Sequence, residues 1–192
     1  MGWVNKLKNV GITKIIDISE NIGHLQIKGK ESSLSNVGPQ EFIIRTADSE
    51  KDIKKALQIH GHSSDTPPPE ERIYKLYRKF GKYTFLIAEN DKKVIGYSFF
   101  KITPSISKNR ISKKAFLVLL GTHPEHRNKG IATILLRTSL QIFEEWGVNK
   151  VYLNVEKNNR CAIALYNKIG FEPVERTNER SCLRLEYWID NV

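Results

Sequence analysis

The sequence predicts a mixed α/β fold with one central sheet. Segments of alternating or continuous apolar residues, typical of strands, are interspersed with segments in which apolar residues recur every three or four positions, as in helices. In chain order they read β-α-α-β-β-β-α-β-α-β-β, an order typical of a mixed sheet covered by helices. A length of 192 residues, 40% of them hydrophobic, suits one domain with its own core.

The first 40 residues differ in pattern from the rest of the chain, and we interpret them as an extension. Apolar residues recur at helical spacing up to Leu25, although residues 14–18 also suit a short strand. Residues 29–40, which include three serines, two glycines and a proline, are typical of a linker. We therefore predict an N-terminal extension and linker at 1–40, packed on the main domain or on a partner, and a main domain at 41–192.

The first half of the main domain predicts a strand, two helices and a hairpin. These elements span 42–45 (strand), 48–60 (helix), 70–80 (helix), 83–89 (strand) and 94–102 (strand). We expect Asp48 to cap the first helix, because an Asp side chain accepts a hydrogen bond from the first helical turn. Gly81 is expected to end the second helix. Residues 61–69, between the helices, contain three consecutive prolines and are predicted to be a loop.

The second half predicts a fourth and a fifth strand, two further helices and a final hairpin. These elements span 115–120 (strand), 131–146 (helix), 151–155 (strand), 160–169 (helix), 171–174 and 183–189 (hairpin). Gly147 and Gly170 are expected to end the two helices. The densest basic cluster, residues 108–114, precedes the fourth strand. We interpret it as a solvated loop, with a phosphate contact as the alternative.

The charge balance favours a polyanionic ligand. The formal net charge is +10 and the sequence pI is near 9.6, which suits either a phosphate-rich cofactor or nucleic acid. No RNP-type aromatic motif accompanies the basic residues, so nucleic acid is the weaker candidate. No apolar run reaches the roughly 18 residues that a membrane span needs, and we expect no membrane contact.

The cysteines and histidines predict a cytoplasmic protein without a metal site. Cys161 and Cys182 lack CxxC spacing, which is typical of a reducing compartment rather than of a disulfide framework. The five histidines show no HxxxH pair, and neither cysteine has a ligand partner nearby in the sequence. The first residues also lack the continuous apolar segment of a secretory signal.

The turn between the fourth strand and the next helix has the features of a phosphate site. Gly121 ends the strand, and Arg127 and Lys129 lie beside Gly130 just before the helix. The first amides of a helix lack internal acceptors and carry the positive end of the helix dipole, so they attract anions. The turn lacks the GK[ST] ending of a Walker loop and the GxGxxG fingerprint. An ordinary strand-to-helix turn therefore stays open as the alternative.

A second motif lies further along the chain. Residues 153–172, LNVEKNNRCAIALYNKIGFE, contain the pattern NxxAxxLYxKxGF. Together the two segments resemble the GNAT superfamily of N-acetyltransferases, and the pattern is most similar to the ribosomal-protein alanine N-acetyltransferases. The resemblance covers about residues 41–189. It implies the GNAT fold, a mostly antiparallel central sheet flanked by helices and splayed between its fourth and fifth strands.

The resemblance implies acetyl-CoA as the donor of an acetyl group. In the family the pantetheine arm lies in the splay, which here corresponds to the backbone of Leu120, Gly121 and Thr122. Arg127 begins the family's R/QxxGxG/A motif, whose amides hold the pyrophosphate. The residues that supply these amides here are Asn128, Lys129, Gly130, Ile131, Ala132 and Thr133.

Two residues of the second motif receive roles by resemblance. Asn159 matches the asparagine that contacts pantetheine, and Tyr166 matches the tyrosine that protonates the departing CoA thiolate. Each also has a structural interpretation. Asn159 is equally suited to cap a helix, and Tyr166 to be a half-buried aromatic on an amphipathic helix.

The general base departs from the family. Relatives of the alanine acetyltransferase kind carry a glutamate on the fifth strand, where this chain has Asn154, which cannot take a proton. Glu156 lies two residues on and on the same face of the strand, so it is our candidate base. His123 and His126 have suitable reference pKa values but lie in the cofactor turn. A water chain, or an amine that arrives neutral, also stays open.

These observations predict an acetyl-CoA-dependent N-acetyltransferase whose acceptor amine attacks the thioester directly. A protein N-terminus or lysine is the first acceptor expected, and a small-molecule amine is the second. We expect the acceptor to enter beside residues 61–69, the second helix and the tip of the last hairpin. The alternative from another class is a non-catalytic acyl-CoA-binding sensor or partner-binding module, and nucleic-acid binding is third. A homodimer stays open.

Overall fold

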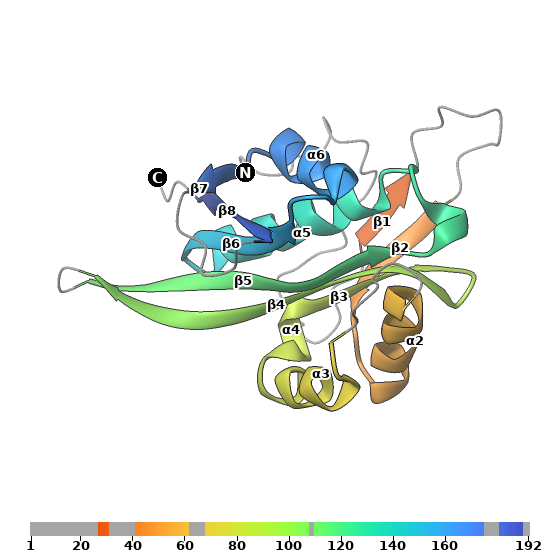
Figure 1. Ribbon diagram of the computed structural model, residues 1–192. Helices are drawn as coiled ribbons and strands as arrows, with labels where there is room; N and C mark the ends of the chain where they lie inside the picture. The colour runs from red at the N-terminus through yellow and green to blue at the C-terminus, as the bar shows by residue number, and fades with distance from the viewer. Residues whose placement is uncertain (1–26, 31–40, 62–67, 108–109, 175–180, 190–192) are drawn as a thin grey trace.

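The centre of the molecule is an eight-stranded sheet in the order β1-β2-β3-β4-β5-β6-β8-β7 (Figure 1). The structure, a computed structural model, describes residues 27–30, 41–61, 68–107, 110–174 and 181–189. The strands are β1 (Ile27–Lys30), β2 (Glu41–Thr46), β3 (Phe85–Asn90), β4 (Lys93–Ser107), β5 (Arg110–Thr122), β6 (Val148–Glu156), β7 (Glu172–Val174) and β8 (Cys182–Trp188). Neighbouring strands are antiparallel except β5 and β6, which are parallel. The predicted mixed, mostly antiparallel sheet is confirmed.

Helices cover both faces of the sheet. They are α2 (Glu50–Gly61), α3 (Glu70–Leu76), α4 (Lys82–Thr84), α5 (Ile131–Glu145) and α6 (Arg160–Ile169), with a π-helical turn (Tyr77–Gly81) and a 3-10 turn (Pro124–His126). In Figure 1, α2, α3 and α4 lie below the sheet, and α5 and α6 lie above it. Within the described part of the chain, no helix is both long and apolar enough to cross a membrane.

Apolar residues hold the helices against the sheet, one layer on each face. On the first face, which we call the α2–α3 layer, Ile53 and Ile73 pack with Phe85. On the other face, Leu135 of α5 packs with Leu86. The neighbours Phe85 and Leu86 enter opposite layers because successive side chains of a strand point to opposite faces. The same alternation decides which side chains of β4 and β5 enter each layer.

The start of α2 differs from the prediction. The helix begins at Glu50, and the amides of Asp52 and Ile53 donate to the carbonyl of Ser49. Ser49 therefore precedes the first helical residue, and the expectation that Asp48 does so is wrong. The Asp48 amide instead donates to the Asp52 carboxylate at 3.2 Å.

Gly81 does not end the second helix, as the sequence predicted. The π-helical turn and α4 continue the helical path to Thr84. Gly81 has φ −73°, so it is not in the left-handed region typical of a helix end. A Cβ at this position would collide with the ring of Tyr77. The glycine therefore provides space for a side chain rather than a helix stop.

The hairpin of β4 and β5 is longer than predicted. Pairing between the two strands extends to Ser107 opposite Arg110, so the interpretation of residues 108–114 as a loop is wrong from Arg110 onward. Lys113 lies in β5, and its Nζ donates to the carbonyl of Trp146 at 2.9 Å.

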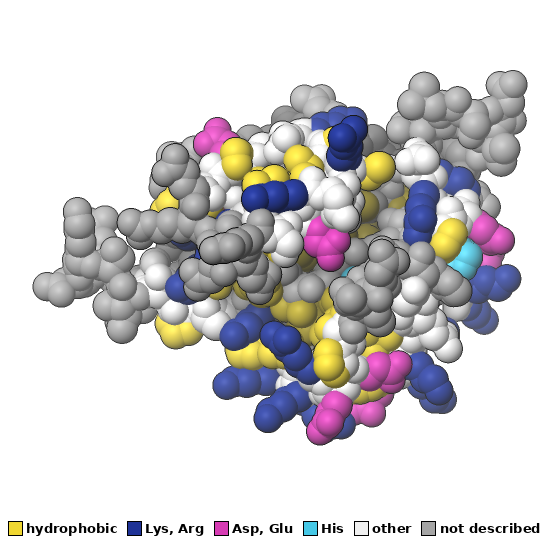
Figure 2. Space-filling view, viewed as in Figure 1, with side chains coloured by type: hydrophobic (Ala, Val, Ile, Leu, Met, Phe, Trp, Pro, Cys, Tyr) yellow, Lys and Arg dark blue, Asp and Glu magenta, His cyan; other side chains and the backbone are white. Residues whose placement is uncertain are grey.

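Figure 2 shows the Lys and Arg side chains spread over this side of the molecule, many of them around the α3–α4 region.

The N-terminal extension contributes a strand. β1 pairs antiparallel with β2, with Gly29 opposite Phe42 and Lys30 opposite Glu41. The predicted linker at 29–40 is therefore wrong for its first two residues. The helical segment predicted up to Leu25 and the rest of the linker lie outside the described residues, and the division at residue 40 stays a prediction.

Arg45 on β2 fixes α2 against the sheet. Its guanidinium donates to both carboxylate oxygens of Asp52, at 2.7 and 3.1 Å, and to Glu89 on β3 at 2.8 Å. Burial alone would raise the pKa of Asp52, but the hydrogen bonds and charge of Arg45 outweigh it and hold that pKa below its usual value. The Asp52 side chain is only 5% exposed. The network thus ties the first turn of α2 to two strands.

Replacing Asp52 with alanine is expected to lower the free energy of unfolding by about 3 kcal/mol, because the largely buried Arg45 then loses the carboxylate that accepts two of its hydrogen bonds. Urea unfolding followed by tryptophan fluorescence measures the change. In the control Glu50→Ala, which removes the exposed partner of Arg78, we expect a change within about 0.5 kcal/mol. Equal losses in the two variants would contradict the anchoring role of Arg45.

Candidate active site

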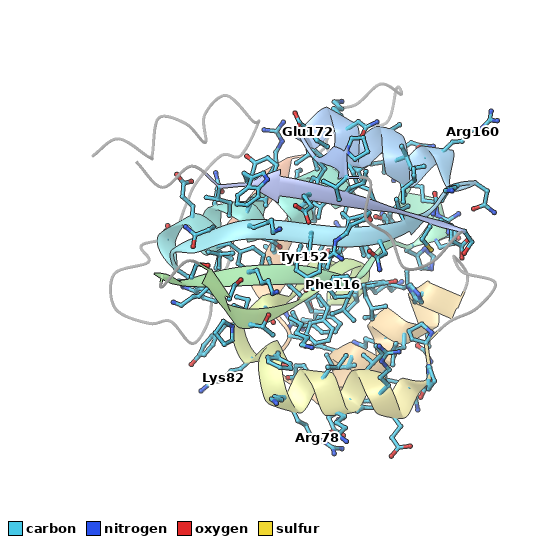
Figure 3. All side chains as sticks on the ribbon, turned by 60° about the vertical axis from the view of Figure 1, so that its left-hand side comes forward. Arg78, Lys82, Phe116, Tyr152, Arg160 and Glu172 are labelled. Atoms are coloured by element: carbon cyan, nitrogen blue, oxygen red, sulfur yellow. The ribbon has the colours of Figure 1, made fainter. Side chains whose placement is uncertain are left out.

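The parallel strands β5 and β6 stop pairing partway along their length. The last pair is Phe116 opposite Tyr152, and Figure 3 shows these two side chains next to each other, with ring centroids 5.1 Å apart. Beyond this pair, β5 continues to Thr122 and β6 to Glu156. The two strands therefore separate toward their carboxyl ends. The predicted splay between the fourth and fifth strands of the main domain is confirmed.

An extra residue in β5 accompanies the separation. Phe99 lies opposite Leu119 and Phe100 opposite Leu117, so Val118 has no partner on β4. Val118 and Leu119 both pack in the α2–α3 layer, which breaks the alternation of the strand. A bulge of this kind bends the bulged strand and increases its twist. It is the physical reason for β5 to leave β6 at this point.

The turn after β5 presents amides without helical acceptors. Asn128 and Gly130 have φ of 61° and 81°, and Gly130 is the N-cap of α5. The amide of Ile134 makes the bond to the Gly130 carbonyl, so the amides of residues 131–133 have no acceptor within the helix. A Cβ on Gly130 would meet nothing within 4 Å. Left-handed residues at such a turn aim successive amides at one point, which suits an anion.

Apart from Asn159, the predicted cofactor residues lie in one continuous stretch of structure. Leu120, Gly121 and Thr122 are the last residues of β5, past its final pair with β6. The 3-10 turn carries the chain from there to Arg127, whose Nε donates to the Thr122 carbonyl at 3.5 Å. The amide turn of residues 128–133 comes directly after Arg127. The end of β5 and the amide turn are therefore neighbours in space as well as in sequence.

The second motif forms α6 and its two ends. Asn159 Oδ1 accepts a hydrogen bond from the Ala162 amide at 3.1 Å, so Asn159 does cap the helix. Tyr166 is 7% exposed, and its ring centroid lies 5.7 Å from that of Phe171. Burial raises the pKa of Tyr166 above its usual value. The phenol therefore keeps its proton at neutral pH.

The structure adds two polar side chains that the sequence did not indicate. Tyr97 on β4 lies opposite Gly121, is fully buried, and has its hydroxyl 2.6 Å from Nδ1 of His60 at the end of α2. Burial, followed by the charge of Tyr166, raises the pKa of Tyr97, whereas Arg127 lowers it. Tyr97 thus lies within electrostatic reach of both predicted site residues. Only the register of β4 against β5 would have pointed to it.

The identity of the general base stays a prediction. Asn154 and Glu156 are exposed on β6, on the same side of the strand. Of the two histidines in the turn, His126 has a pKa lowered by burial and then by the nearby charges of Lys129 and His123. Neither the exposure of Glu156 nor the lowered pKa of His126 identifies one of them as the general base.

Three residues of the turn form the one group of possible metal ligands found among the described residues. Ligand atoms of His123, Glu125 and His126 lie within 4.8 Å of one another, and the side chain of Glu125 is 82% exposed. The His123 Nδ1 and Glu125 Oε2 atoms are 3.9 Å apart. Zinc with Zn–N bonds of about 2.0 Å needs about 3.3 Å between ligand atoms. The side chains would have to move to bind zinc, so the group is not a preformed zinc site.

A separate open hollow of about 470 Å³ lies beside the turn. It is lined by parts of α2, the β3–β4 hairpin and the turn, namely Lys55, Gln58, Ile59, Lys92, Lys93, Val94 and His123. Tyr166 and Gly121 do not line it, so it is distinct from the space where β5 and β6 separate.

Comparison with known proteins agrees with this geometry. Residues 52–171 match the Acetyltransferase (GNAT) family. The chain is 28% identical over 141 residues to an N-alpha-acetyltransferase of Saccharolobus solfataricus, which covers 71% of this chain and 83% of that protein. It is 27% identical over 147 residues to a mycothiol acetyltransferase of Saccharomonospora viridis, covering 71% of this chain but 48% of that protein, so it spans about half the length of this relative.

Solved structures share the fold. The NatC complex bound to Gag peptide and CoA matches with a TM-score of 0.67 at 17% identity, covering 78% of this chain and 99% of that one. The ribosomal-protein-S18-alanine N-acetyltransferase from Escherichia coli matches with a TM-score of 0.61 at 19% identity, covering 77% and 94%. Since the family match spans more than half of the chain and the relatives agree with it, the protein belongs to the acetyltransferase (GNAT) family and is an N-acetyltransferase.

Proposed function

We propose that the protein transfers an acetyl group from acetyl-CoA to a primary amine of a protein, with an N-terminal α-amine as first acceptor and lysine next. The observation that carries this proposal is the carboxyl end of β5, which no longer pairs with β6, beside the amide turn at the start of α5. The strand edge suits the amides of pantetheine, and the turn suits its pyrophosphate. No other feature of the described residues offers both sites in one continuous segment.

The residues present fit acetyl-CoA as donor. The amides of residues 128–133 and the charge of Arg127 would hold the pyrophosphate, and the backbone of residues 120–122 would hold the pantetheine arm. An amide from this part of β5 would also stabilise negative charge on the reacting carbonyl oxygen. When bound, acetyl-CoA supplies a thioester whose carbonyl carbon accepts the amine and whose sulfur leaves.

Tyr166 is the proposed general acid. Its hydroxyl keeps its proton because burial raises its pKa. A neutral phenol that faces the leaving sulfur can give it a proton. Asn159, which caps α6 through its Oδ1, is proposed to position the start of that helix beside the pantetheine arm.

An α-amine is the acceptor that the chemistry favours. Its reference pKa is about 7.7 to 8.0, against about 10.4 for lysine, so a far larger fraction is neutral at physiological pH. The similarity to an N-alpha-acetyltransferase supports the same choice. The net charge of +10 argues against strongly cationic acceptors. A small-molecule amine is the second candidate.

A non-catalytic acyl-CoA sensor is the alternative function. The observation that favours it is Asn154, an exposed amide where the resembling enzymes carry a glutamate. The amide turn would serve binding alone equally well. Buried Tyr166 argues for chemistry instead, because a sensor needs no proton donor at the leaving sulfur.

Incubation with acetyl-CoA and a panel of acceptors separates these functions. The panel holds peptides with free and with blocked N-termini, each with and without lysine, and small amines. We expect thiol release, measured with a thiol reagent, to be fastest with free N-termini, because more of that amine is neutral. CoA binding with no thiol release across the panel would favour the sensor.

Gly130→Glu is expected to weaken CoA binding at least about tenfold, because it adds a like charge to the pyrophosphate turn. Isothermal titration with CoA measures the change. Gly147→Glu is the matched control, since Gly147 also has positive φ and open space around a Cβ but lies at the other end of α5. If the two variants bound CoA equally well, the assignment of the turn would be wrong.

Tyr166→Phe is expected to lower kcat about 10² to 10³-fold while CoA affinity stays within about threefold, because only the proton donor is lost. Steady-state kinetics with the best acceptor of the panel measures this. The control is Tyr187→Phe, which removes a hydroxyl from the ring that packs on Phe171, as Tyr166 also does. Full turnover by Tyr166→Phe would place the acid elsewhere.

A further inference from the structure

The proposed transfer needs a route for the proton of the acceptor amine. With a reference pKa of about 7.7 to 8.0, most of an α-amine is protonated at neutral pH and cannot attack. Asn154 cannot take the proton, and Glu156 is exposed at the end of β6. A hydrogen-bonded pair, Tyr97 and His60, lies on the β4 side of β5.

The hydroxyl of Tyr97 reaches the part of β5 that no longer pairs with β6. Tyr97 lies opposite Gly121 in the β4–β5 register, and its hydroxyl occupies the place where a side chain of residue 121 would be. The phenol therefore lies over the backbone proposed to hold the acetyl-bearing end of the donor.

His60 completes the pair from the α2 side. Its Nδ1 is 2.6 Å from the Tyr97 hydroxyl, a short hydrogen bond. His60 is half-buried, whereas Tyr97 is fully buried. Burial lowers the pKa of His60, so the ring is neutral at pH 7 and has one nitrogen able to accept a proton. The pair thus runs from the buried site to a residue with solvent access.

We propose, as a step that rests on the proposed transferase function, that Tyr97 and His60 carry the proton away from the acceptor amine. Tyr97 Oη accepts a proton from the ammonium group while its own proton passes to His60 Nδ1. Tyr97 stays neutral throughout, and His60 becomes an imidazolium that later releases the proton to water. Because the Tyr97 side chain has no exposed surface, the acceptor amine would have to enter the splay to reach its hydroxyl, and His60 would act through Tyr97.

The remaining bonds and protons balance. The freed amine lone pair forms the N–C bond to the acetyl carbon, and the C–S bond breaks with its electron pair on sulfur. Tyr166 gives its proton to that sulfur and regains one from the nitrogen, which becomes an amide. The net products are the acetylated amine, CoA with a free thiol, and one proton released from His60.

The groups that face this pair are few among the described residues. Tyr166 of α6 and Arg127 of the turn act on Tyr97, in opposite directions. The pKa of His60 is lowered by burial. A pH dependence of the transfer would therefore report His60 and the acceptor amine.

The test compares wild type with His60→Gln, since glutamine keeps a hydrogen-bonding side chain but cannot be protonated. We expect kcat/KM for an α-amine peptide to fall at least about 30-fold near pH 7, as for loss of a general base. The deficit should shrink to within about tenfold above about pH 9, where the amine is neutral without help. A purely structural role for His60 predicts a deficit that is the same at every pH.

A second variant tests whether the two residues act together. Tyr97→Phe keeps the buried ring and should show the same pH-dependent deficit as His60→Gln. The double variant should be no worse than either single one, because both remove one route. The control is Ser139→Ala, which removes the partner of Ser98, the neighbour of Tyr97 on the opposite face of β4; it should leave the pH profile unchanged.

The outcomes are distinguishable. Multiplicative losses in the double variant, or a deficit in His60→Gln that does not change with pH, would overturn the proton route while leaving the transferase intact. The proton route would also be overturned if Glu156→Gln, and not His60→Gln, showed the pH-dependent deficit in kcat/KM. Wild-type protein that binds CoA by titration but releases no thiol with any acceptor would instead overturn the proposed function, and this route with it.

Discussion

The single extra residue in β5 is the constraint on which the rest of the site depends. Parallel strands that keep their register satisfy each other's backbone groups along their whole length. Because Val118 has no partner on β4, β5 bends, and its pairing with β6 ends at Phe116. Beyond that point the backbone of β5 stays paired with β4 but no longer pairs with β6. The same bend sets the direction in which the chain enters the amide turn, so the two halves of the proposed donor site result from one irregularity.

Segments far apart in the chain meet at this irregularity. α2 brings His60 from one face, and its position is fixed by the buried ion pairs of Arg45. α6 brings Tyr166 from the other side of the separated strands, where Phe171 supports its ring. Both phenols have pKa values raised mainly by burial, so both remain neutral hydroxyls. The two phenols differ in their surroundings. The Tyr97 hydroxyl is hydrogen-bonded to the imidazole of His60, whereas Tyr166 packs among apolar side chains.

Features that depend on neighbours in sequence could be predicted, and features that depend on register could not. The amide turn, the α6 cap at Asn159 and the glycine ends of α5 and α6 all result from local backbone chemistry, and the positive φ of Gly147 and Gly170 confirms the last of these. The prediction that Gly81 ends a helix was wrong because this glycine is required by packing: it leaves space for the Tyr77 ring. The pairing of Tyr97 with His60 joins residues 37 positions apart, and it becomes visible only once β4 is aligned with β5.

The contact between Gly121 and Tyr97 also restricts how this chain can diverge. Any side chain at position 121 would take the place of the phenol, so that position can enlarge only if position 97 becomes smaller. Enlarging it alone would push the hydroxyl away from His60 and disturb the buried pair. In descendants of one ancestor the two positions should therefore change together. A lineage that keeps a tyrosine on β4 should keep a glycine opposite it, because the packing of the two residues requires it.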